Sequence, residues 1–244
     1  MLTHTPEIPE RHHHHQPSTL LAGRSLTRRD LLTASAAMAG AGLFGVSTPT
    51  LGQTPALRPT PDQAIGPFYP VLAPVDQDAD LTTIAGAAGR ALGQVLYLSG
   101  VVTNLRGEPV AGAVVEIWQA NAVGRYTHPA DDNPQPIDAN FDGFARIRTD
   151  SDGSYRFKTI KPGAYPVGAV AGWTRPPHIH FDVKGRASRI LTQMYFEGEA
   201  LNEKDPYLQG SARKDALIAH YGAPSGQQEA NALVAKWNIV LRSG

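Results

Sequence analysis

The chain reads Leu96-Tyr97-Leu98-Ser99-Gly100-Val101-Val102 where its first clear β pattern begins. A turn-prone run from Asn104 to Pro109 follows, and the β-branched run from Val114 to Trp118 comes next. Short β-branched and aromatic runs separated by Gly, Pro, Asn and Asp are typical of antiparallel strands. Residues 96–118 therefore predict two strands.

The same pattern continues toward the C-terminus. Ala145–Thr149 and Ser154–Phe157 alternate in hydrophobicity on either side of the turn Asp150–Gly153, which indicates a hairpin. The remaining expected elements are strands at His178–Val183 and Leu191–Phe196, and helical segments around Ala212 to His220 and Glu229 to Ala235. This pattern predicts a mainly β fold, a sandwich of two sheets with long loops and short C-terminal helical segments. The strands and turns also resemble transthyretin-like modules, most of which have no active site.

Composition excludes several classes of function. The 244 residues include 22 Lys+Arg and 22 Asp+Glu, so the formal net charge is zero and a broad nucleic-acid footprint is absent. Cysteine is absent, which excludes disulfides, zinc-thiolate sites, iron–sulfur clusters and cysteine nucleophiles. The 24 glycines and 20 prolines favour a loop-rich chain. We expect one domain with a substantial core.

Residues 1–52 are interpreted as a disordered N-terminus followed by an export signal. Arg28 and Arg29 precede the uncharged run from Leu31 to Val46, as in a bacterial twin-arginine signal. A membrane anchor is the alternative, because the absence of charge extends to Leu57. Ala, Gly, Ser and Thr dominate this stretch, so we expect cleavage near Gly52 and no stable membrane insertion afterwards. Residues 53–244 would then form the folded domain, in the periplasm or outside the cell.

Two histidine patterns differ in what they indicate. The run His12–His15 can bind metal by composition, but it lies in an irregular polar segment and is interpreted as a flexible tail. His178 and His180 are two residues apart in an expected strand, so both side chains project from one face. The apolar Ile179 and Phe181 fall on the other face. A metal site on the histidine face is one reading of this pattern, and chance is the other.

The candidate partners for these histidines are carboxylates and tyrosines. The chain has no His-Glu-x-x-His helix, so the familiar zinc-protease pattern is absent. Tyr126 and Tyr165 both lie in turn-rich segments, where a side chain can be directed into a site. An isolated tyrosine is more often a packing residue with a satisfied hydroxyl.

In combination, these segments resemble the intradiol ring-cleavage dioxygenases, the family of protocatechuate 3,4-dioxygenase and catechol 1,2-dioxygenase. The resemblance extends over roughly Thr60 to Leu208. It rests on Leu98-Ser99-Gly100, Gly107-Glu108-Pro109-Val110, Val115 to Asn121, Gly124-Arg125-Tyr126, Gly163-Ala164-Tyr165-Pro166, Arg175 to Phe181, Leu191 to Phe196 and, upstream, Gly66-Pro67-Phe68-Tyr69.

The resemblance implies an active site with one non-haem Fe(III) per chain and an aromatic diol and O2 as substrates. The implied iron ligands are Tyr126, Tyr165, His178 and His180, a set of hard phenolate oxygens and imidazoles that suits ferric iron. Arg175 would stabilise negative charge on the substrate, and Tyr165 would accept a proton and leave the iron. The implied substrate contacts are Gln193, Pro67, Tyr69 and Trp173. A homo-oligomer is expected.

Some features leave alternatives open. Val167 stands where the protocatechuate enzymes carry a tryptophan, so the aromatic wall is either more open or supplied by Trp173. The acidic loop Thr127 to Asn140 either borders the pocket and disfavours anions or is simply solvated. An exported transthyretin-like binding module without iron is the alternative function, and a zinc hydrolase using His178 and His180 with a carboxylate is a third. The identity of the diol stays open.

Overall fold

The computed structural model describes residues 57–71, 78–168 and 172–244. These ranges belong to one unit of the chain, Gly52–Gly244. The predicted export signal at 1–52, with its histidine run, lies outside the described residues. Within the described ranges, every helix is too short or too polar to cross a membrane.

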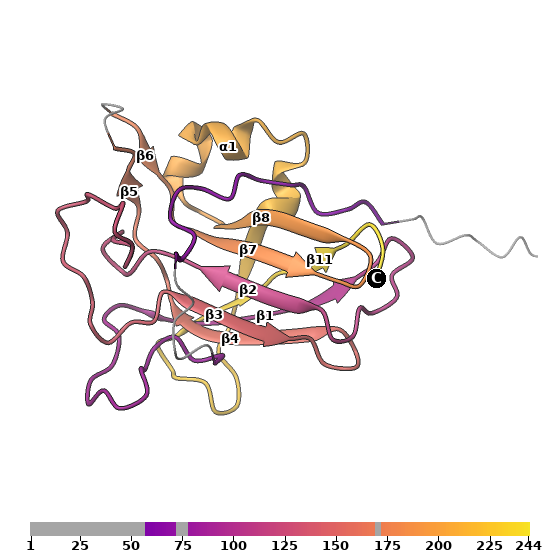
Figure 1. The fold of residues 1–244 in the computed structure, drawn as a ribbon, viewed down its shortest axis with the longest axis horizontal. Coiled ribbons are helices and arrows are strands. Elements are labelled where there is room, and N and C mark those ends of the chain that lie inside the picture. The colour runs from indigo at the N-terminus through magenta and orange to yellow at the C-terminus, as the bar shows by residue number, and fades with distance from the viewer. Residues whose placement is uncertain (1–56, 72–77, 169–171) are drawn as a thin grey trace, which may run out of the picture. The chain divides into compact units, whose positions relative to one another are not determined.

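Strands dominate the described residues (Figure 1). They are β1 Val95–Thr103, β2 Val114–Trp118, β3 Phe144–Arg148, β4 Ser154–Ile160, β5 Tyr165–Pro166, β6 Thr174–Arg175, β7 His178–Lys184, β8 Arg189–Phe196, β9 Ile218–Gly222, β10 Leu233–Lys236 and β11 Ile239–Val240. The helical segments are η1 Ala200–Lys204, α1 Pro206–Gln209 and η2 Lys214–Leu217. The expectation of a mainly β chain is confirmed.

The strands form two groups that share one core. One group contains β3, β2, β7 and β8, and the other contains β9, β10, β1 and β4, with β11 beside β1. The parallel pairing of β8 with β9 joins the groups. The ring of Phe181 on β7 lies 6.2 Å from Tyr155 on β4 and 4.9 Å from Trp237, which follows β10. These contacts place the core between the two groups.

Alternation along β7 separates the core from the site. Ile179 and Phe181 point into the core and have no exposed surface. His178 and His180 point to the opposite face, as expected for a strand with a buried side on each face. The register places His180 opposite Trp118 on β2 and Gln193 on β8. The sheet therefore presents polar and aromatic side chains together at the ends of three adjacent strands.

Two sequence-based expectations are wrong. The turn Asp150–Gly153 forms, but β3 pairs with β2 whereas β4 pairs with β1, so the expected hairpin divides between the two groups. The segment Glu229 to Ala235 contains β10 rather than a helix, because parallel pairing with β1 overrides the helix propensity of its Ala and Leu residues. In Ala212 to His220 only η2 is helical, and β9 begins directly after it.

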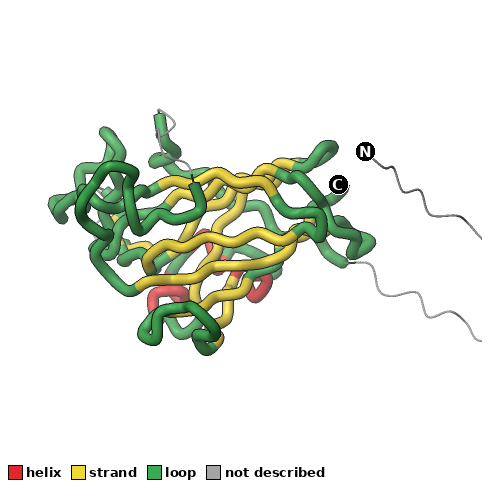
Figure 2. Tube along the Cα trace, turned by 90° about the horizontal axis from the view of Figure 1, so that it is seen from below, coloured by secondary structure: helices red, strands yellow, loops and turns green. Residues whose placement is uncertain are grey.

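The long connections gather at one end of the strands (Figures 1 and 2). They include residues 119–143 between β2 and β3, and the short hairpin of β5 and β6. Residues 57–71 reach the same region by running beside β8, where the backbone N–H of Gln63 donates to the Leu191 carbonyl at 2.8 Å. The residues expected at the active site lie in these connections and at the adjoining strand ends.

Candidate active site

The Tyr126 loop is held by one asparagine side chain. The Asn121 Oδ1 atom accepts hydrogen bonds from the amides of Val123 and Arg125, at 3.0 and 2.9 Å. This arrangement is the Asx-type turn for which asparagine is favoured. The Tyr126 amide then donates to the Asp131 carboxylate at 2.7 Å. The backbone that leads into Tyr126 is therefore fixed by polar side chains.

Glycines bring the two tyrosine segments together. Gly124 has a φ of +80°, and a Cβ at this position would lie 2.2 Å from the Ala164 carbonyl oxygen. A Cβ on Gly163 would lie 2.6 Å from the Ala122 carbonyl oxygen. Only glycine permits such a close approach of two backbones. As a result, Tyr126 and Tyr165 face each other although they are far apart in sequence.

The β5–β6 hairpin places Tyr165 directly opposite Arg175. Two prolines follow Arg175, and the chain then enters β7 at His178. The His178 Nδ1 atom lies 2.7 Å from the Pro176 carbonyl oxygen, which can only accept, so Nδ1 is the protonated nitrogen. The Nε2 atom of His178 is therefore unprotonated, and it lies beside Tyr165 and His180.

Four aromatic side chains close into a ring. Tyr126 lies 5.4 Å from Tyr165 between ring centroids, and Tyr165 lies 5.5 Å from His178. His178 lies 4.8 Å from His180, which lies 6.4 Å from Tyr126. The Nε2 atoms of His178 and His180 are 3.2 Å apart, and the Tyr165 hydroxyl lies 3.5 Å from the Nε2 atom of His178. The structure thus brings together all four residues predicted from the sequence as metal ligands.

Burial controls the protonation of these four groups. Burial and the positive charge of Arg175 lower the pKa of His180 to about 3, and they hold the pKa of His178 well below its ordinary value. Both imidazoles are therefore neutral, the form that binds metal. Burial also raises the pKa of Tyr126 and of Tyr165, and the charge of Arg175 partly offsets the increase at Tyr165. A cation at the centre would reverse the shift at both phenols.

The donor set suits a hard metal ion. The Tyr126 hydroxyl and the His180 Nδ1 atom are buried and have no hydrogen-bond partner among the described residues. A buried hydroxyl without a partner is costly, and a metal ligand role would explain it. The described residues contain no cluster of three or more His, Asp and Glu side chains able to hold a metal. The oxygen atoms beside the two histidines in this ring belong to Tyr126 and Tyr165.

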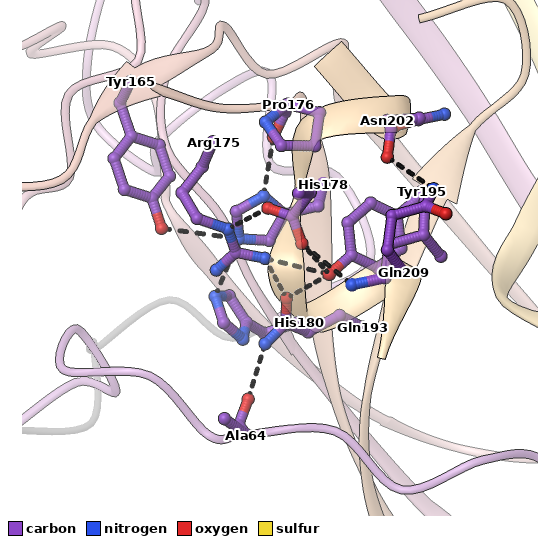
Figure 3. A network of polar contacts seen from close by, with 12 residues as sticks. Ala64, Tyr165, Arg175, Pro176, His178, His180, Gln193, Tyr195, Asn202 and Gln209 are labelled. Atoms are coloured by element: carbon purple, nitrogen blue, oxygen red, sulfur yellow. Dashed lines mark hydrogen bonds and ion pairs between the residues drawn. The ribbon is translucent and has the colours of Figure 1, made fainter. Parts of the chain in front are cut away.

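A buried polar network surrounds Arg175 (Figure 3). Its Nε atom donates to the Asp205 carboxylate at 2.6 Å, and its Nη2 atom donates to Gln193 Oε1 at 2.7 Å and to the Tyr195 hydroxyl at 2.9 Å. The Tyr195 ring also stacks on His178, with centroids 5.7 Å apart. The network fixes the guanidinium beside the ring of four aromatic side chains.

Sequence reasoning missed Asp205, Tyr195 and Tyr207. Asp205 precedes Pro206 and accepts from the Leu208 amide at 2.9 Å, so the sequence marks it as an N-cap residue. No local pattern indicates that its carboxylate also binds Arg175, which lies 30 residues earlier. The Tyr207 ring covers the guanidinium at 4.6 Å.

A pocket of about 280 Å³ opens beside this network. The predicted substrate contacts Pro67, Trp173 and Gln193 line it, together with Tyr165 and Arg175. Val167 also lines it, and its amide donates to the Trp173 carbonyl at 2.9 Å, so the tryptophan lies across the hairpin from the valine.

Tyr69 does not line this pocket. Its hydroxyl donates to Glu116 at 2.9 Å, and its ring contacts Trp118 at 4.9 Å and Phe144 at 6.5 Å between centroids. The neighbouring Phe68, which lies in a turn, lines the pocket instead. Tyr69 therefore supports the wall behind the site rather than contacting the pocket.

Comparisons with known proteins agree on one family. The model described as Dioxygenase matches residues 64–243. The beta chain of protocatechuate 3,4-dioxygenase from Burkholderia cepacia is 42% identical over 198 residues, which cover 78% of this chain and 84% of that protein. Catechol 1,2-dioxygenase 1 from Acinetobacter lwoffii is 40% identical over 118 residues, covering 43% of this chain and 37% of that protein. The dioxygenase domain of a carbohydrate-binding fusion from Streptomyces sp. SirexAA-E has a TM-score of 0.58 at 26% identity, covering 77% of this chain and all of that domain.

Proposed function

We infer the reaction of this chain from its family, because the chain belongs to the intradiol ring-cleavage dioxygenases. It is an oxidoreductase that opens the aromatic ring of a catechol-type diol between the two hydroxyl-bearing carbons. Both atoms of O2 enter the product, a cis,cis-muconate-type dicarboxylic acid. The observation that supports this function best is the closed ring formed by Tyr126, Tyr165, His178 and His180.

We propose that these four residues hold one non-haem Fe(III) ion per chain. Ferric iron prefers hard anionic oxygen ligands, and two phenolates would offset two of its three positive charges. When bound, the ion would supply a Lewis-acidic centre that withdraws electron density from the diol. The unprotonated Nε2 atom of His178 and the unpartnered hydroxyl of Tyr126 support this assignment.

The surrounding residues would bind and orient the diol. Tyr165 belongs to the ring of four and also lines the pocket. Its Oη atom is therefore placed to accept a proton from a diol hydroxyl. Arg175 is fixed by Asp205 and would stabilise negative charge that develops on the substrate, as a preorganised cation does. Gln193, whose amide nitrogen donates to the Ala64 carbonyl at 2.6 Å, would present its buried side chain to the same space.

A visible absorption spectrum, with iron measured in the same sample, tests this function. Tyrosinate bound to Fe(III) gives a broad charge-transfer band, and adding a catechol without oxygen should shift it. We expect Tyr126→Phe to lose the band and most of the iron. Tyr97→Phe is the matched control, because Tyr97 lies on β1 away from the pocket. A chain that stays colourless after iron loading, and converts no diol under oxygen, would refute the proposal.

We also propose the finer points that the sequence predicts. Residues 1–52 would direct export by the twin-arginine route, so the mature domain, residues 53–244, would act in the periplasm or outside the cell. Replacing Arg28 and Arg29 with lysine should retain the chain in the cytoplasm. The two groups of strands would form a transthyretin-like sandwich, and the chain would assemble as a homo-oligomer, which sedimentation of the purified chain can test.

A further inference from the structure

We propose that the pocket beside Tyr165 selects diols whose ring carries no anionic group, and that Asp132 is the residue that excludes anions. This inference rests on the proposed function and specifies its substrate class. It concerns the part of the ring remote from the two hydroxyls, where ring-cleavage substrates differ in their substituents.

The cation in the pocket already has a carboxylate partner and further hydrogen-bond acceptors. Arg175 is the positively charged residue among the described residues that line the pocket. Its guanidinium is 4% exposed and pairs at 2.6 Å with Asp205, which has no exposed surface. Its Nη2 atom donates to Gln193 and Tyr195. A ring carboxylate entering the pocket would therefore meet a guanidinium whose charge is balanced.

The remaining charge on the wall is negative. Asp131 is buried, accepts the Tyr126 amide and lies 3.5 Å from Arg125, so its charge is also compensated. Asp132 lines the same pocket, is exposed, and makes no ion pair with the described residues. The pocket thus combines two balanced ion pairs with one uncompensated carboxylate, which repels an anion.

The rest of the wall suits an uncharged ring. The Trp173 and Tyr207 rings lie 5.8 Å apart at its edge, and Val167 and Pro67 are apolar. Moving a carboxylate into such surroundings without a partner is costly. The similarity to a protocatechuate dioxygenase chain would by itself favour the opposite substrate, since protocatechuate carries a ring carboxylate.

A matched pair of diols tests the inference. Protocatechuate (3,4-dihydroxybenzoate) and 3,4-dihydroxybenzamide have nearly the same shape and differ in charge. We would measure kcat/KM for both with the iron-loaded chain, and binding of both without oxygen from quenching of tryptophan fluorescence. We expect the amide to be preferred at least about tenfold in both measurements. Raising the salt concentration should reduce the preference, because screening weakens the repulsion from an exposed carboxylate.

Two variants locate the effect. Asp132→Asn should improve kcat/KM for protocatechuate about threefold to fivefold and leave the amide unchanged, the order expected for one partly solvated charge. Asp152→Asn is the matched control, since Asp152 is an exposed carboxylate in the turn before β4 and does not line the pocket. An unchanged preference in Asp132→Asn would overturn the role of that residue.

The possible outcomes distinguish failure of this inference from failure of the proposed ring-cleavage function. Protocatechuate used as well as the amide would overturn the inference and leave the ring-cleavage function intact. If catechol, protocatechuate and the amide all fail to bind and to react, the proposed function itself fails, and the inference fails with it.

Discussion

Replacing Asp205 with asparagine should destabilise the chain strongly although the shape of the side chain is unchanged. Asp205 is completely buried and pairs at 2.6 Å with Arg175, which is 4% exposed. Removing one member of a buried ion pair leaves the other charge uncompensated, which costs about 3–5 kcal/mol. Asparagine is as good an N-cap residue as aspartate, so the bond from the Leu208 amide should persist. The charge should therefore account for most of the loss.

The expected loss is large for a single domain. A decrease of about 3 kcal/mol lowers the melting temperature of a domain of this size by roughly 6–12 °C. Guanidinium titration followed by tryptophan fluorescence measures the free energy of unfolding. The double variant Arg175→Met with Asp205→Asn removes both charges, so its loss should be at least about 2 kcal/mol smaller than the sum of the single losses.

Two results would refute this reasoning. The first is an Asp205→Asn variant whose free energy of unfolding stays within about 0.5 kcal/mol of the parent chain, the usual range for a surface substitution. The second is a double variant whose loss equals the sum of the single losses, because the two charges would then not interact.

Three further predictions concern packing, pH and the metal site. Gly100→Ala should cost more than about 3 kcal/mol or prevent folding, since its Cβ would lie 1.7 Å from a backbone oxygen, whereas Gly222→Ala, with nothing within 4 Å, should be tolerated in the same denaturation assay. Burial raises the pKa of Tyr155, so this residue ionises first in the unfolded chain, and above about pH 10 it should lower the free energy of unfolding by up to about 1.4 kcal/mol per pH unit. Tyr155→Phe should remove this share of the slope, to which Tyr126 and Tyr195 also contribute. Gly66→Ala would place a Cβ 3.0 Å from His180, so it should weaken iron binding about tenfold in an iron titration. Gly86→Ala is the control, because Gly86 has a similar positive φ but open space around it, and it should leave iron binding unchanged.

Each of these predictions has a contrary result. Equal stability of the Gly100 and Gly222 variants would show that the close approach in β1 does not occur. If the free energy of unfolding falls as steeply with pH in Tyr155→Phe as in the parent chain, alkaline unfolding depends on other groups. Equal iron affinity in the Gly66 and Gly86 variants would show that the contact between a Cβ at position 66 and the histidine does not affect iron binding.

Local chemistry predicted the strands, whereas the set of four aromatic residues at the site followed from the resemblance to the intradiol dioxygenases. The period of two along residues 178–183 assigns both histidines to one face, and the turn residues around Tyr126 and Tyr165 indicate loops. The structure agrees with the strands and brings the four side chains together. The charge of the loop at Asp131 and Asp132 is also visible in the sequence, although its position at the pocket is not.

The sequence by itself therefore determined which side chains share a face and which segments turn, because both follow from the backbone geometry of neighbouring residues. Only the tertiary structure decided which strands pair with each other and which buried charges form ion pairs. Three features join residues that no local pattern connects. They are the pairing of β3 with β2 and of β4 with β1, the parallel pairing of β10 with β1, and the ion pair between Arg175 and Asp205. Such pairings depend on the free energy of the whole packed core, to which alternation, turn chemistry and propensity contribute only locally.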